Sequence, residues 1–96
     1  MPVIKLFANL RQIVKSPSVA VSGSTVGEAV GELCKISPAL KEKLFQNGEL
    51  RPLYIISLNG RHIDLIKGLD TEAQITDEIA IFPPIAGGSL ELFGKL

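Results

Sequence analysis

The stretch DEIAIFPPIAGG, residues 77–88, decides what fold this chain can adopt. Residues 78–82 alternate so that the two isoleucines point to one face while Ala80 and Phe82 point to the other, which is the period of a β-strand. The proline pair that follows lacks the backbone N–H groups that a sheet ladder needs. The stretch therefore predicts a last strand that ends at Phe82, followed by a narrow tail.

A second strand is predicted near the start of the chain, over residues 3–10. Its side chains alternate between two faces, one holding Ile4, Leu6 and Ala8 and the other holding Val3, Lys5 and Phe7. Because Lys5 is charged, its face is expected to look outward, and Phe7 is then exposed beside it. If this strand lies next to the last one, Phe7 and Phe82 share the outer face of the sheet.

A helix is predicted after a short β-branched strand at residues 18–22, which closes a hairpin with the first strand. Thr25 stands three residues before Glu28, the spacing of a capping box in which hydroxyl and carboxylate satisfy free backbone N–H groups. The apolar residues that follow repeat at helical spacing and lay one stripe on the sheet: Val26, Ala29, Val30, Leu33 and Cys34.

The middle of the chain predicts a second, peripheral helix over residues 38–45. A proline can occupy its first position, because the N–H that proline lacks is not needed there, and Asn47-Gly48 is expected to end it. Residues 53–58 are apolar on both faces, as expected for a strand that is covered on each side.

Asn59-Gly60 is the strongest short hairpin signal in the chain and leads to a brief partner strand at residues 62–63. A turn at residues 68–71 then precedes the last strand. A chain of 96 residues fits one domain, and it contains no internal repeat, low-complexity run or linker. This order of hairpin, helix and further strands predicts a compact α+β domain.

Charge and the composition of the first residues restrict the partners. Ten basic and ten acidic side chains cancel, so no global field attracts nucleic acid or an anionic membrane surface. The first dozen residues carry polar and charged side chains, unlike a signal peptide or a spanning segment. We therefore expect a cytoplasmic protein that uses neither nucleic acid nor a membrane as partner.

The residues that usually carry catalysis are too sparse for an active site. Cys34 is the only cysteine and lies on the apolar helix stripe, so it is expected to be buried. His62 is the only histidine and follows a turn, which favours a surface or turn role. The carboxylates late in the sequence stand in turns and not as a spaced pair on one element, which is typical of a solvated acidic edge: Asp64, Asp70, Glu72, Asp77 and Glu78. No phosphate-binding glycine motif occurs, so we expect no metal and no bound cofactor.

The role of the glycine pair at residues 87–88 can be inferred only together with other parts of the sequence. A bare Gly-Gly pair favours a flexible connector, although glycines can also thread a slot that is too narrow for a Cβ. This pair comes with four further blocks, which cover nearly the whole domain: KLFANLRQ at 5–12, STVGEAVGEL at 24–33, LNGRHI at 58–63 and GLDT at 68–71. With these blocks the sequence resembles the MoaD/ThiS family of ubiquitin-like sulfur carriers, and within it the small subunits of molybdopterin synthase.

The resemblance implies a β-grasp fold, in which a mixed sheet of four to five strands curls around one main helix and the first and last strands are adjacent and parallel. It implies that the carboxylate of Gly88 is activated with ATP as an acyl-adenylate, by an enzyme similar to ubiquitin-activating enzymes, and is then converted to a thiocarboxylate. The tail that enters the partner enzyme would be Ile85, Ala86, Gly87 and Gly88. The carrier itself is a cosubstrate and not a catalyst.

The same resemblance implies a docking face. Phe7, Phe82 and Arg11 would contact the activating enzyme and the large subunit of molybdopterin synthase, and Pro83-Pro84 would aim the tail. Exposed aromatic rings beside an arginine are also typical of interface hot spots. The alternative is partial burial of these side chains beneath the domain's own loops. The ending IFPPIAGG favours the molybdenum or tungsten pterin cofactor as the product, with thiamine, cysteine or another sulfur-containing metabolite as alternatives.

The chain departs from the family pattern after Gly88, which is joined to Ser89 by a peptide bond and so has no carboxylate to activate. One hypothesis is that a metal-dependent peptidase cuts between these two residues, which divides the chain into a carrier domain, residues 1–88, and an extension, residues 89–96, that is removed. The other keeps the extension and makes the domain a binding module. Four apolar residues of the extension would then dock on a partner or on the domain's own sheet edge: Leu90, Leu92, Phe93 and Leu96.

Overall fold

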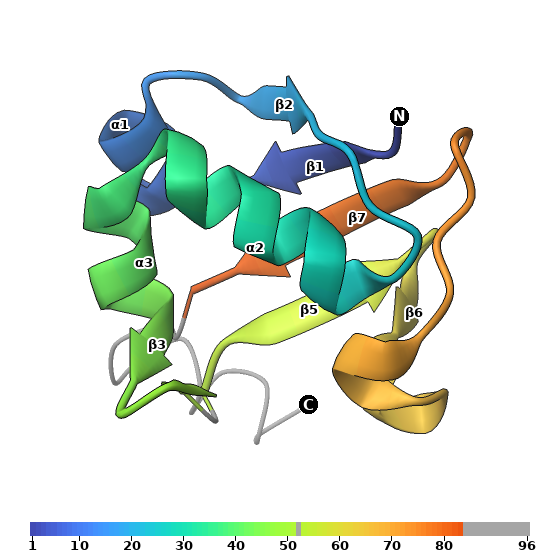
Figure 1. Cartoon of the computed structure of the whole chain (residues 1–96). Coiled ribbons are helices and arrows are strands. Elements are labelled where there is room, and N and C mark those ends of the chain that lie inside the picture. Colours follow the sequence, from blue (N-terminus) through green and yellow to red (C-terminus); the bar gives the residue numbers. More distant parts are fainter. Residues whose placement is uncertain (52, 84–96) are drawn as a thin grey trace, which may run out of the picture.

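The computed structural model describes residues 1–51 and 53–83 of the chain. Figure 1 shows its two layers, a twisted sheet and a set of helices that cover one face of it. In chain order the elements are β1 Val3–Leu6, α1 Asn9–Val14, β2 Ser18–Ala20, α2 Val26–Ile36, α3 Pro38–Leu44, β3 Phe45–Gln46, β4 Glu49–Leu50, β5 Ile55–Leu58, β6 Arg61–His62 and β7 Glu78–Phe82. Two 3-10 turns, Ile63–Leu65 and Gly68–Asp70, lie between β6 and β7.

Five strands form one mixed sheet in the order β2-β1-β7-β5-β6, and β3 pairs with β4 in a separate hairpin. The first and last strands are adjacent and parallel, with Val3 opposite Glu78 and Leu6 opposite Ile81. The other three pairings of the sheet are antiparallel. The predicted α+β domain, a β-grasp fold with a mixed sheet around one main helix, is therefore confirmed.

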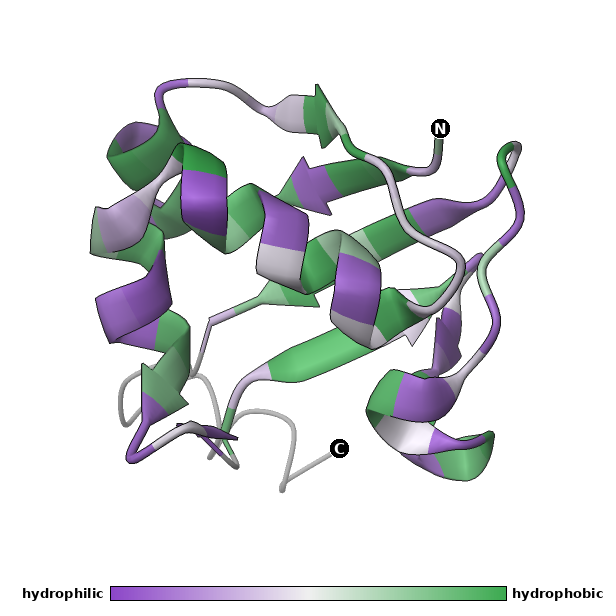
Figure 2. Cartoon of the chain, in the orientation of Figure 1, coloured by the Kyte–Doolittle hydropathy of each residue, from purple (hydrophilic) through white to green (hydrophobic). Residues whose placement is uncertain are grey.

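The core lies between the sheet and α2. All five residues of the predicted helix stripe are buried, and Cys34 among them is 6% exposed, as expected. Figure 2 shows β5 and β7 largely in hydrophobic colours, whereas hydrophobic and hydrophilic segments alternate along α2. The Thr25 hydroxyl accepts a hydrogen bond from the Glu28 N–H at 3.1 Å. The Glu28 carboxylate accepts from the Ser24 N–H at 2.8 Å, one residue further back than a capping box predicts.

The first strand is shorter than predicted, because the chain leaves the sheet after Leu6 and forms α1 instead of continuing to residue 10. The backbone turns at Ala8, whose φ is +54°, a left-handed conformation that breaks the alternation of a strand. Leu10 is fully buried, and Ile13 and Val14 pack against the core three and four residues later. This helical spacing competes with the strand pattern and prevails over it beyond Phe7.

Three predictions for the middle of the chain are wrong, the last of them in part. Asn47-Gly48 does not end a helix but forms the turn of the β3–β4 hairpin, where both residues have positive φ values of 56° and 80°. The second helix is not peripheral either, since Leu40 and Leu44 are fully buried. The strand at 55–58 is covered on both sides only in part, because on the face opposite α2 Ile55 is exposed while Ser57 is buried.

The loop before β7 is held by Asp77. Its carboxylate accepts hydrogen bonds from the Gln74 N–H at 2.7 Å and from the Asn59 amide at 3.0 Å, and these two bonds keep the pKa of Asp77 below its usual value of 3.8. A depressed carboxyl pKa stabilises the fold above the usual pKa, and the stabilisation is lost as the pH falls through the folded-state value.

We therefore expect Asp77→Asn to be less stable than the native chain at pH 7, with the difference shrinking as the pH falls below about 4. Urea unfolding of both chains between pH 7 and about pH 2 measures this. Because the other carboxylates are common to both chains, the difference isolates Asp77. A difference that stays constant over this range would contradict the role given to the Asp77 carboxylate.

Candidate partner-binding surface

The outer face of the sheet, opposite α2, carries two stacked aromatic rings. Since Leu6 is opposite Ile81 in the parallel β1–β7 pair, the next residues, Phe7 and Phe82, fall side by side. Their ring centroids are 4.5 Å apart and the ring planes are inclined by 15°. Phe82 keeps 36% of its surface exposed, and Phe7 is half-buried. The predicted neighbourhood of the two rings is thus confirmed, with Phe82 open to solvent.

Arg11 joins these rings because the turn at Ala8 brings α1 back over the end of β1. Its Nε donates a hydrogen bond to the Leu6 carbonyl at 2.9 Å, which fixes the side chain. Its Cζ lies 5.6 Å from the centroid of the Phe7 ring, within cation–π range. The guanidinium is thereby held beside the rings, at the edge of an exposed surface.

The sequence analysis missed one member of this surface. Ile55 of β5 is the antiparallel partner of Phe82 and is 44% exposed. Arg11, Phe7, Phe82 and Ile55 therefore form one row that runs from α1 past the end of β1 to β7 and β5, and we call it the aromatic row. Ser57, two residues further on, lies on the same face as Ile55 but is buried, so only the pairing of β5 with β7 identifies Ile55 as part of this surface.

The chain leaves the sheet at the aromatic row. Pro83 follows Phe82 directly, is half-buried and lies outside the ladder. The remaining predicted site residues lie outside the described residues, and their roles stay predictions: Pro84, Ile85, Ala86, Gly87, Gly88 and Ser89. The described part of the structure thus places the aromatic row directly before the predicted tail.

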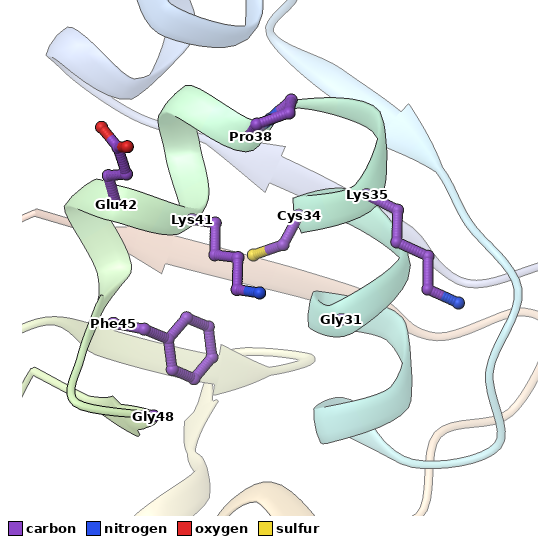
Figure 3. Close-up of a pocket in the computed structure, with 8 residues that line it drawn as sticks. All are labelled: Gly31, Cys34, Lys35, Pro38, Lys41, Glu42, Phe45 and Gly48. Atoms are coloured by element: carbon purple, nitrogen blue, oxygen red, sulfur yellow. The ribbon is translucent and has the colours of Figure 1, made fainter.

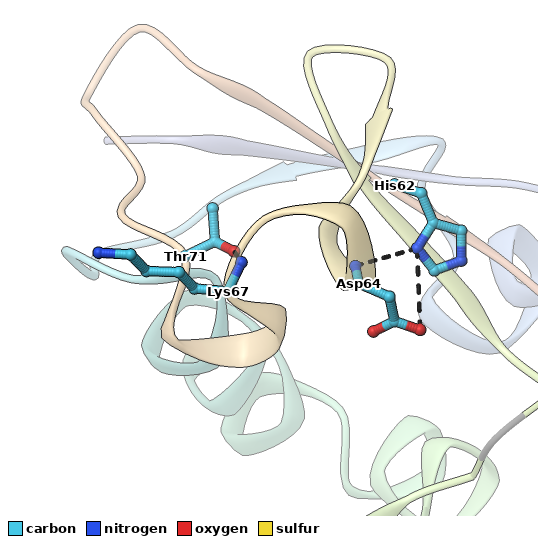
Figure 4. A network of polar contacts seen from close by, with 4 residues as sticks. All are labelled: His62, Asp64, Lys67 and Thr71. Carbon is cyan, nitrogen blue, oxygen red and sulfur yellow. Dashed lines mark hydrogen bonds and ion pairs between the residues drawn. The ribbon is translucent and has the colours of Figure 1, made fainter.

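His62 has a local structural role, as predicted. Its Nδ1 accepts a hydrogen bond from the Asp64 N–H at 3.1 Å, and this caps the 3-10 turn after β6 (Figure 4). The next turn is closed in a similar way, by the Lys67 N–H bonding to the Thr71 hydroxyl at 3.1 Å. Within residues 1–51 and 53–83, no three His, Cys, Asp or Glu side chains gather as metal ligands would. In the same part of the chain, no helix is long and apolar enough to cross a membrane.

Comparison with known families agrees with this geometry. The family model described as "ThiS family" matches residues 4–88 of the chain, from the start of the first strand through the Gly-Gly pair. The chain belongs to the ThiS family. Its members are ubiquitin-like sulfur carriers and small modifiers, which are not catalysts themselves and which work with ubiquitin-activating-like enzymes and further partner enzymes. The match ends at Gly88, so the extension after it lies outside the family pattern.

Individual relatives cover nearly the whole chain. It is 39% identical over 88 residues to small archaeal modifier protein 1 of Haloferax volcanii, an alignment that covers 88% of this chain and 97% of the relative. It is 30% identical over 88 residues to small archaeal modifier protein 3 of the same organism, with coverage of 88% and 96%. The solution structure of small archaeal modifier protein 1 from Methanosarcina acetivorans superposes with a TM-score of 0.84 at 36% identity, covering 91% of this chain and 95% of the other.

Proposed function

We propose that this chain is a sulfur carrier for molybdenum or tungsten pterin cofactor synthesis, and that it acts after a cut between Gly88 and Ser89. The carrier family itself is established by the match over residues 4–88. The resemblance of the IFPPIAGG ending to molybdopterin synthase small subunits supports the pathway. The observation that carries the proposal is the aromatic row, an exposed apolar and cationic surface at the point where the tail leaves the sheet.

The chemistry explains why the cut is needed. A peptide carbonyl between Gly88 and Ser89 has no free oxygen to react with ATP, whereas hydrolysis of that bond with water leaves the Gly88 carboxylate. The carboxylate oxygen attacks the α-phosphorus of ATP, pyrophosphate leaves, and an acyl-adenylate forms. A sulfide equivalent then attacks the carbonyl and displaces AMP, which leaves a thiocarboxylate. The activating enzyme supplies the site for both steps, and the peptidase for the cut is proposed to be metal-dependent.

The surface that binds the partners follows from the aromatic row. Aromatic and arginine side chains dominate interface hot spots, and aromatic rings bury large areas at a low cost in side-chain entropy. Here the rings are already stacked and Arg11 is already fixed by its bond to Leu6, so little order is lost on binding. We propose that the activating enzyme and the large synthase subunit use this same row in turn, while the tail enters their active sites.

We expect the chain that ends at Gly88 to gain a thiocarboxylate when it is incubated with ATP, a sulfur donor and its activating enzyme, and the full-length chain to gain none. Intact-mass spectrometry detects the exchange of one oxygen for sulfur. Equal labelling of both chains would show that the extension is no block. Failure of the Gly88-ended chain to react, with an activating enzyme that modifies another carrier, would overturn the carrier function.

A second function is favoured by the relatives, two of which are named small archaeal modifier proteins at 39% and 30% identity. A modifier would use the same acyl-adenylate, but a lysine amine of a target protein would displace AMP and form an isopeptide bond to Gly88. To separate the two functions, a tagged Gly88-ended chain is expressed in its native cells. Targets that carry a covalently attached C-terminal glycine remnant after proteolysis would support the modifier function.

A further inference from the structure

A hollow lies on the helix layer, away from the aromatic row. It lies between α2, α3 and the β3–β4 hairpin and has a volume of about 680 Å³, within the size range of binding pockets. Figure 3 shows the side chains that surround it, with Cys34 and Phe45 turned inward and Lys41 reaching across it. Its lining residues are Gly31, Cys34, Lys35, Pro38, Lys41, Glu42, Phe45 and Gly48. The aromatic row lies on the opposite side of the sheet, so its proposed role in partner binding does not involve this hollow.

Gly31 of α2 lines this hollow and is an unusual residue for the middle of a helix. A glycine inside a helix destabilises it relative to alanine, so it normally has a packing reason. Gly27, one turn earlier, has such a reason, because a Cβ there would lie 3.0 Å from the Leu69 carbonyl oxygen. Around Gly31, apart from its chain neighbours and the nearby backbone of α2 itself, no atom of the described residues lies within 4 Å of the Cβ position. A further segment that packs on α2 at Gly31 would explain the glycine, because the segment would occupy the space that a Cβ needs.

We propose that residues 89–96, the extension SLELFGKL, occupy this hollow in the full-length chain. Four of the eight residues are large and apolar and suit a hollow lined by Cys34, Pro38 and Phe45. The extension also carries one acidic residue, Glu91. Lys41 at the hollow makes no ion pair within the described residues and is exposed, so it is a ready partner for that carboxylate.

The point where the chain leaves the sheet allows this path. Phe82 stacks on Phe7, which stands two residues before α1, and α1 contacts α3 at the same end of the molecule (Figure 1). The nine residues from Pro84 to Leu92 reach about 30 Å when extended. This exceeds the 26 Å of the shortest dimension of the protein. The segment is therefore long enough to bring Leu92 and Phe93 from the end of β7 to the hollow on the helix layer.

The docked extension would have two consequences. It would cover its own apolar side chains, which otherwise remain in water, and it would leave the aromatic row free for partners. The docking proposal does not rest on the proposed function, because the extension would dock in the same way whether it is later removed or kept. It gives the retained-extension hypothesis a specific place on the domain, on the helix layer and not at the sheet edge.

Cys34 provides the measurement, because it lines the hollow and is the only cysteine of the chain. We expect iodoacetamide to alkylate Cys34 at least fivefold faster in the full-length variant Leu92→Ser/Phe93→Ser than in the native full-length chain. The chain that ends at Gly88 should react as fast as this variant. Equal rates in all three chains would overturn the proposal. An alkylation rate that does not change with urea concentration below the unfolding transition shows that the thiol reacts in the native state and not through unfolding.

The ion pair gives a second, independent arm. Lys41→Glu and Glu91→Lys should each speed alkylation in the full-length chain, and the double variant should restore the native rate, because the charges are then exchanged. In the Gly88-ended chain, Lys41→Glu gives the baseline effect of the charge on the thiol itself. Double-variant alkylation that is as fast as in either single variant would contradict the pairing.

Varying the protein concentration shows whether the extension that fills the hollow comes from the same chain or from a second copy. Protection that is independent of dilution supports docking within one chain, whereas protection that is lost on dilution would mean that the extension of a second copy fills the hollow, and would overturn the proposal as stated. Neither result depends on adenylation of Gly88. A failure of docking therefore leaves the thiocarboxylation test unaffected, and the reverse also holds.

Discussion

Phe82→Ala is expected to lower the efficiency with which the Gly88-ended chain is adenylated by about 30-fold or more. Central aromatic residues of interface hot spots contribute about 2 kcal/mol or more to binding, and 1.4 kcal/mol corresponds to a factor of ten. Phe82 is the central ring of the aromatic row, between Phe7 and Ile55, and it keeps 36% of its surface available. The variant should also lose about 1 kcal/mol of stability, from the lost ring stacking.

Release of pyrophosphate, measured as a function of carrier concentration, gives this efficiency. Ile55→Ala should lower it in the same direction but less, because Ile55 stands at the end of the row. Leu65→Ala is the matched control, since Leu65 is an equally apolar side chain, 72% exposed, in the 3-10 turn after β6. A Phe82→Ala chain that is folded and adenylated as efficiently as the Leu65→Ala chain would remove the aromatic row from the proposed function.

Much of the fold could be predicted from the sequence because its signals are local. The bounds of β7 agree with the prediction at both ends, since Glu78–Phe82 alternates and a proline follows directly. The start of α2 was predicted from Thr25 and Glu28, and its buried stripe agrees residue by residue. The hairpin at Asn59-Gly60 was predicted because both residues favour the positive φ that its turn requires, and φ is 51° and 85° there.

The errors arose where two local patterns compete or where a contact is long-range. Residues 3–10 alternate like a strand, yet Leu10, Ile13 and Val14 also have helical spacing, and burial against the core decides in favour of α1. Asn47-Gly48 suits a helix end and a hairpin equally well, and only the pairing of Phe45 with Leu50 distinguishes them. Ile55 could not be assigned to the docking surface because the register that sets it beside Phe82 joins segments far apart in the sequence.

Ile81→Ala is expected to show the opposite behaviour to Phe82→Ala, although the two residues are neighbours in β7. Ile81 is fully buried on the face that packs under α2, with Leu6 and Ile56 as its partners on the flanking strands. Removing such a side chain lowers the free energy of unfolding by about 2–5 kcal/mol, because transfer energy is lost and a cavity remains. For a domain of this size, that is a large fraction of the total stability.

Urea unfolding of the Gly88-ended chain, followed by circular dichroism, measures this loss. The fraction of Ile81→Ala that stays folded should still be adenylated with the native efficiency, since Ile81 does not reach the outer face. Phe82→Ala should do the reverse, with a small change in stability and a large one in efficiency. Because adjacent residues of a strand point to opposite faces, the pair separates stability from recognition within one element. An Ile81→Ala chain that keeps its stability, or that loses adenylation while fully folded, would contradict this division of β7.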